Sequence, residues 1–185
     1  MFFFVQTVVI LVGAVLHILL DRKPNRHTKR RTVELLLIWF VAAGGVMAIL
    51  GGIGHVGPDS AGVAAGIGYE PSMFQWEVGW ADIAIGVAGF VCIWKRDSWM
   101  TCAVVVLAIS YGGDAIGHVM QYVAHANTAP NNVWAIPSDI MQPLLVVGLL
   151  VAYRMLSRRE AAAATEAEGA EAPALAEAAA ADASA

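Results

Sequence analysis

Long apolar runs alternate with short polar segments along this chain. Each of five runs matches the roughly 20 mostly apolar residues that a helix needs to cross a bilayer. The runs cover residues 2–20, 33–54, 73–94, 99–123 and 138–156. This pattern predicts an all-α protein, an integral membrane bundle of five transmembrane helices within residues 1–159.

Composition separates this predicted bundle from the end of the chain. Hydrophobic residues make up 58% of the 185 residues, above the roughly 45–50% of an average soluble domain. Residues 160–185 consist almost entirely of Ala and Glu and lack a large apolar stripe that could be buried. We therefore expect residues 160–185 to form a disordered cytoplasmic tail.

The basic residues predict the orientation of the bundle, because cytoplasmic loops retain Lys and Arg. All 11 basic residues lie at the end of, or after, the first, third or fifth run. They are Arg22, Lys23, Arg26, Lys29, Arg30, Arg31, Lys95, Arg96, Arg154, Arg158 and Arg159. Five crossings therefore place the N-terminus outside and the C-terminus in the cytoplasm.

The fourth run contains an acid and a histidine where a lipid-facing helix would carry Leu or Val. Asp114 and His118 are four residues apart, so a helix places them on one face. Gly112, Gly113 and Gly117 keep this part of the helix slender and allow another backbone to approach. The fourth span is therefore expected to have one polar face inside the bundle.

The third run carries two acids on different faces. Asp82 follows Gln75 by seven residues and shares its face, whereas Glu77 lies about 140° from Asp82 on an ideal helix. At ~1.5 Å per residue, Asp82 lies roughly 13 Å deep, near the bilayer midplane. The ionisable residues expected in the outer half of the bundle are His55, Glu77, Asp82, Asp114, His118 and Asp139.

No Lys or Arg is available to neutralise these outer acids, because all of them are predicted on the opposite side. An unpaired charge near the midplane costs at least ~2.5 kcal/mol. The acids are therefore protonated, or they pair with histidines or dipoles, or they bind an external cation. Two positions also have structural interpretations: Glu77 lies in a first helical turn, and Asp139 is suited to cap the last span.

Several short motifs resemble a bacterial family of small multi-span membrane proteins of unknown function. They are a Gly-His at Gly54 and His55, a Pro-Asp at Pro58 and Asp59, and an Ile-Gly-aromatic at Ile67, Gly68 and Tyr69. Phe74, Gln75, Glu77, Val78 and Gly79 then match Phe-Gln-x-Glu-Val-Gly, and Gly117, His118 and the Asn-rich segment before Ser138 and Asp139 complete the resemblance. It covers residues 40–150 and implies a multi-pass protein of the bacterial cytoplasmic membrane, without implying a reaction.

Three functions are compatible with these residues. The first is a site in the outer half that binds a small ligand, a substrate or a divalent metal, with or without enzymatic activity. Histidine nitrogens and carboxylate oxygens suit Zn, Mn or Fe, with Asp114, His118, Glu77 and His55 as the candidate ligands and no recognised metal-binding spacing.

The second function is a proton-coupled transporter or proton relay through Asp82, Asp114 and His118. The third is a subunit or scaffold of a membrane complex, in which the polar residues hold helices together and a second copy or another membrane protein is the partner. The lipid bilayer is a partner in all three. Nucleic-acid binding is not expected, because the one basic run is explained by topology and contact with anionic lipid.

Overall fold

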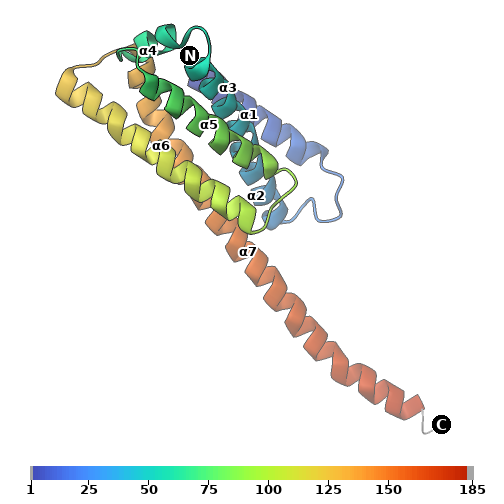
Figure 1. Ribbon diagram of the computed structural model, residues 1–185. Helices are drawn as coiled ribbons and strands as arrows, with labels where there is room; N and C mark the ends of the chain where they lie inside the picture. Colours follow the sequence, from blue (N-terminus) through green and yellow to red (C-terminus); the bar gives the residue numbers. More distant parts are fainter. Residues whose placement is uncertain (1, 183–185) are drawn as a thin grey trace.

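The computed structural model describes the backbone of residues 2–182 and the side chains of residues 5–170, and the described backbone is helical without strands (Figure 1). The helices are α1 (Phe2–Leu20), α2 (Lys29–Ile38), the π-helical segment η1 (Trp39–Ala43), α3 (Gly44–Val56), α4 (Ser60–Ile67), α5 (Met73–Val91), α6 (Ser98–His125) and α7 (Pro130–Asp182). The prediction of an all-α protein is confirmed.

Fewer helices than expected are both long and apolar enough to cross a membrane. Within the described residues these are Lys29–Val56, which joins α2, η1 and α3, together with Ser98–His125 and Pro130–Ala170. The described apolar part of α1, Val5–Leu20, is shorter, and the polar residues in the first half of α5 lower its hydropathy. By this measure, three of the five predicted spans are found among the described residues, those predicted at 33–54, 99–123 and 138–156.

The helices associate as two close pairs. In the first pair, α3 and α5 pack along their length through glycines. A Cβ atom at Gly45 would lie 2.5 Å from the carbonyl oxygen of Gly86, and one at Gly89 would lie 2.6 Å from that of Val41. In the second pair α6 packs against α7, whereas α5 and α6 contact each other over few residues. This sparse contact leaves space between the pairs.

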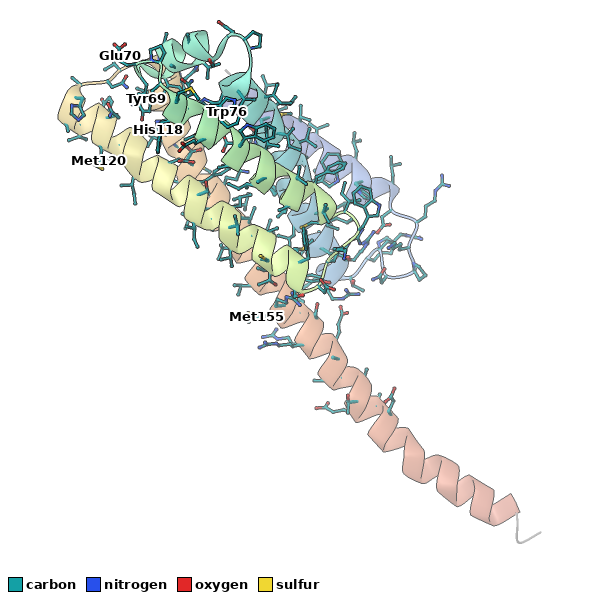
Figure 2. The ribbon with its side chains drawn as sticks, in the orientation of Figure 1. Tyr69, Glu70, Trp76, His118, Met120 and Met155 are labelled. Carbon is teal, nitrogen blue, oxygen red and sulfur yellow. The ribbon has the colours of Figure 1, made fainter. Side chains whose placement is uncertain are left out.

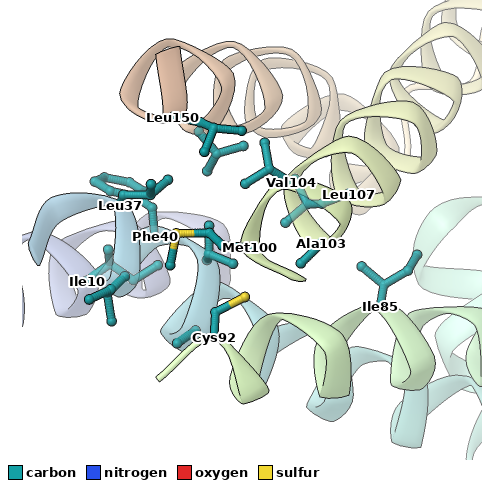
Figure 3. Packing of buried hydrophobic residues seen from close by; sticks show 14 residues of the cluster. Ile10, Leu37, Phe40, Ile85, Cys92, Met100, Ala103, Val104, Leu107 and Leu150 are labelled. Carbon is teal, nitrogen blue, oxygen red and sulfur yellow. The ribbon is translucent and has the colours of Figure 1, made fainter. Parts of the chain in front are cut away.

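A hydrophobic core joins the two pairs over much of the bundle (Figure 3). Leu37 and Val41 are fully buried with Met100 and Val104 of α6 and Val146 of α7. The core fills this part of the bundle with apolar side chains.

One end of the bundle is basic and is held together by ion pairs. Arg31 contacts Asp21 at 2.7 Å and Glu34 at 2.9 Å, and the second oxygen of Glu34 contacts Arg96 at 2.9 Å. Arg154 donates to the carbonyl of Asp97 at 2.7 Å. The α1–α2 connector, the α5–α6 connector and α7 therefore meet at this basic end, as the charge pattern predicted.

Helix α7 differs from the predicted last span at both ends. It begins at Pro130 rather than residue 138, and proline suits a first helical position because its missing N–H would have no partner there. It continues through Asp182, since Ala and Glu favour helix. Residues 161–170 are exposed along this extension, where a disordered tail was expected.

Candidate functional site

A cavity of about 550 Å³ lies at the end of the bundle opposite the basic end. We call it the polar cavity, and side chains from α1, α3, α4, α5, α6 and α7 line it. Five of the six predicted site residues contribute to its wall, namely His55, Asp82, Asp114, His118 and Asp139. Since α5 and α6 contact each other so little, acids on these two helices can face a common space.

His118 is held by a hydrogen-bond network that determines which ring nitrogen carries the proton. The side-chain N–H₂ group of Asn132 donates to the carbonyls of Asn127 at 3.1 Å and His118 at 3.3 Å. The other atom of this amide, Oδ1, therefore faces His118 Nδ1 at 2.8 Å as an acceptor. Nδ1 must carry a hydrogen, and Nε2 of the neutral ring is left with its lone pair.

Asp139 lies on the other side of the His118 ring. Its Oδ2 atom is 3.8 Å from His118 Nε2, and the residue is only 8% exposed. Asp139 lies inside α7, more than two turns after Pro130, so the expectation that it caps the last span is wrong. No donor among the described residues makes a hydrogen bond to its carboxylate, which leaves the carboxylate oxygens available to the cavity.

Tyr69 completes the surroundings of His118 from the α4–α5 connector. Its ring runs nearly parallel to the imidazole, with centroids 6.4 Å apart and an interplanar angle of 26°. Figure 2 shows Tyr69 and His118 together at the end of the bundle opposite the long extension of α7. Burial, together with the negative charge of Asp114, raises the pKa of the Tyr69 hydroxyl above its ordinary value. Tyr69 therefore remains a neutral hydrogen-bond donor at physiological pH.

His55 adopts the opposite tautomer on α3. Gln75 Nε2 donates to the carbonyl of Ser60 at 2.9 Å and lies 3.2 Å from His55 Nδ1, so Nδ1 accepts. The neutral ring of His55 consequently carries its hydrogen on Nε2. The two histidines of the cavity thus offer different groups, a donor at His55 and an acceptor at His118.

Asp82 on α5, Asp114 on α6 and Glu70 of the α4–α5 connector also contribute to the acidic wall. Asp82 is half-buried, Asp114 is exposed, and the charges of Asp82, Asp114 and Asp139 are close enough to act on one another. No Lys or Arg lines the cavity, so these acids meet no permanent positive charge there. The absence of a basic partner, inferred from the sequence, is therefore found in the structure.

Glu77 does not belong to this cavity. It is exposed and lies on a face of α5 different from that of Asp82, as helical geometry requires. Among the described residues, no three His, Cys, Asp or Glu side chains lie close enough to hold a metal ion. The proposed metal site of Asp114, His118, Glu77 and His55 is therefore unsupported, because Glu77 points elsewhere and the other side chains surround an open space.

Further residues of the site were missed, including Tyr69, Glu70 and Tyr111 of the cavity wall. Asn132 is fully buried and orients His118, although its place in an Asn-rich connector indicated only a turn. Gln6 of α1 and Gln142 of α7 line the cavity, and Gln142 Nε2 is buried without an acceptor among the described residues. The sequence feature that could have indicated Gln6 and Gln142 is an isolated glutamine inside an apolar run, because its amide needs hydrogen-bond partners within the membrane.

Comparison with known proteins places the chain in a family. A family model described as "Family of unknown function (DUF6790)" matches residues 1–159. The match ends where the Ala- and Glu-rich segment begins. No curated protein and no solved structure matches the chain.

Proposed function

The chain belongs to this family of unknown function, and on that premise we propose that it is a multi-pass membrane protein whose polar cavity binds a small cationic ligand or substrate. One observation carries the proposal: a cavity of about 550 Å³ is lined by three aspartates and by no Lys or Arg. The volume is within the range of roughly 300–1,000 Å³ that small-molecule sites occupy.

Connectivity supports a topology in which α1 and α5 also cross the membrane. Helix α5 joins the cavity end of α3 to the basic end of α6, and its 19 residues extend about 28 Å. Helix α1 runs from Gln6 at the cavity to the Asp21–Arg31 pair at the basic end. With the basic end in the cytoplasm, the cavity opens toward the outside of a bacterial cytoplasmic membrane.

The electrostatics of the cavity favour a cation over other ligands. A carboxylate surrounded by hydrocarbon is costly unless a positive charge or hydrogen bonds compensate it. Asp82 and Asp139, which are half-buried and nearly buried, receive no such compensation from Lys or Arg. A bound cation would supply the missing charge, and the ring faces of Tyr69 and Tyr111, which also line the cavity, are suited to contact it.

A binding site is better supported than a proton path or a transport path through the protein. Below the cavity, Leu107 and Val104 of α6 belong to the hydrophobic core, together with Val146 of α7. These side chains are at most 2% exposed, and they offer no polar group to carry a proton or an ion toward the basic end. The cavity is therefore described best as a chamber that is closed on the cytoplasmic side.

The experiment compares ligands of one size and three charges: n-butylammonium, n-butanol and butyrate. Ligand at ten times its Kd stabilises by about 1.4 kcal/mol, which raises the melting temperature of a chain of this length by about 3–6 °C. We expect this rise with butylammonium alone, measured by thermal unfolding of the protein in lipid nanodiscs.

Two glycine variants locate the binding. A Cβ atom at Gly113, in the cavity wall, would meet nothing within 4 Å, and the same holds for Gly148, which lines neither the cavity nor a groove. We expect Gly113→Leu to project a side chain into the cavity and abolish the stabilisation, and Gly148→Leu to retain it. The proposal is wrong if butylammonium stabilises none of these proteins, or if it stabilises both variants equally.

A further inference from the structure

A second hollow, of about 570 Å³, lies on the outer face of helices α6 and α7. We call it the α6–α7 groove. Apolar or small residues line it, including Gly112, Ile116, Pro143 and Leu144, and Asp139 is its one ionisable residue. Asp139 also lines the polar cavity, so the groove and the cavity meet at this residue.

The same stretch of α6 presents open space to both hollows. Gly112 lines the groove and Gly113 lines the cavity, and a Cβ atom at either position would meet nothing within 4 Å. The sequence suggested that these glycines admit another backbone. No backbone of the described chain approaches them. The space on both sides of α6 is therefore open to a ligand.

Asp139 lacks the usual helical donor to its backbone carbonyl. In an α-helix its backbone carbonyl would accept a hydrogen bond from the residue four positions later, which is Pro143, and proline has no N–H to donate. The carboxylate receives no hydrogen bond from a described residue, and His118 Nε2 is 3.8 Å away. Residue 139 thus places a nearly buried carboxyl group and its backbone carbonyl at the apolar groove.

We propose that the cationic ligand is a membrane-resident amphiphile with a primary ammonium head group, whose head lies at Asp139 and whose alkyl chain lies in the α6–α7 groove. This inference rests on the proposed function and adds the chemical class of the ligand. A primary ammonium provides three N–H donors and a positive charge, which match the carboxylate of Asp139 and its carbonyl, to which Pro143 donates no hydrogen bond. The groove lets the chain of such a molecule remain in an apolar environment while its head reaches the polar cavity.

The carboxyl group of Asp139 and the connection between groove and cavity favour this occupant over an ordinary lipid or another helix. A neutral chain would fill the groove equally well but would leave Asp139 uncompensated. A helix would be too wide to reach the acid between α6 and α7, which pack closely on each other. A ligand that is slender, apolar along its length and positive at one end matches the residues of both hollows.

The test compares a long and a short amine in lipid nanodiscs, with dodecylammonium and butylammonium as probes and dodecanol as the neutral long-chain control. Three proteins are used: the full chain, the groove variant Gly112→Leu and the control Gly148→Leu. Binding is measured as the shift in melting temperature against the mole fraction of each probe in the lipid. Each probe partitions into the lipid to the same extent with all three proteins. A difference in melting-temperature shift between the proteins therefore reports binding to the protein.

We expect dodecylammonium to bind Gly112→Leu about tenfold more weakly than the full chain, a difference of about 1.4 kcal/mol, and to bind Gly148→Leu normally. Butylammonium, which needs no groove, should bind all three equally. Equal binding of dodecylammonium to the full chain and Gly112→Leu would overturn the inference and leave the proposed function intact, as would equal binding of dodecanol and dodecylammonium. Failure of both amines to bind the full chain would overturn the proposed function as well.

Discussion

The close approach of α3 and α5 can be tested with two glycines of the same helix. In Gly45→Ala the new Cβ atom would lie 2.5 Å from the carbonyl oxygen of Gly86 and 3.0 Å from the backbone nitrogen of Phe90. Both neighbours are backbone atoms, so a rotamer change cannot relieve the overlap and the helices must move apart. In Gly51→Ala the Cβ atom would meet nothing within 4 Å.

The cost of the close contact is the difference in unfolding free energy between the two variants. Both gain the same helix propensity, about 1 kcal/mol for replacing glycine by alanine, so this gain cancels in the comparison. Overpacking of a tight contact costs about 1–3 kcal/mol, and only Gly45→Ala incurs it. We therefore expect Gly45→Ala to be less stable than Gly51→Ala by about 1–3 kcal/mol.

Reversible unfolding in mixed micelles, with increasing SDS and circular dichroism as the probe, measures this difference directly. Gly86→Ala, on the other side of the same contact, should be destabilised like Gly45→Ala, because its Cβ atom would approach the carbonyl of Gly45. Equal stability of Gly45→Ala and Gly51→Ala would refute the glycine-mediated packing of α3 on α5.

Three further outcomes are expected. Asn132→Ala removes the three hydrogen bonds of a buried amide and should lower the free energy of unfolding by about 2–4 kcal/mol, whereas exposed Asn131→Ala should change it little in chemical unfolding. ¹⁵N NMR should find neutral His118 protonated at Nδ1, and in Asn132→Ala this preference should be lost. Hydrogen bonds from Arg31 lower the pKa of Asp21 to about 2 from 3.8, so their stabilisation is present above pH 3.8 and is lost as the pH falls through 2. Acid unfolding curves of Asp21→Asn should lack this component.

Residue patterns predicted the framework of the cavity well because helix geometry is local. The spacing of Asp114 and His118 placed them on one face, and the angle between Glu77 and Asp82 already indicated that they diverge. Five of the six candidate residues line the cavity, and Glu77 is the exception. The clustering of every Lys and Arg at one end likewise followed from the order of apolar runs and basic connectors.

Contacts between distant segments were beyond the reach of such patterns. Nothing local indicates that Asn132 turns its amide toward His118, since this depends on how the α6–α7 connector folds back. Asp139 was assigned to a helix start because Ser138 and Asp139 are both good caps, but Pro130 begins α7 earlier. The glycines of α6 were expected to admit another backbone, and no described backbone approaches them.

The position of a bound cation tests the central claim most directly. Solid-state NMR can measure the dipolar coupling between ¹⁵N-labelled butylammonium and the ¹³C-labelled aspartate carboxyl carbons of the protein in lipid. A cation bound in the polar cavity should give a coupling that Asp139→Asn reduces, that Gly113→Leu abolishes and that Gly148→Leu leaves unchanged. No coupling in the full chain, or the same coupling in all of these proteins, would contradict a cation site in the cavity.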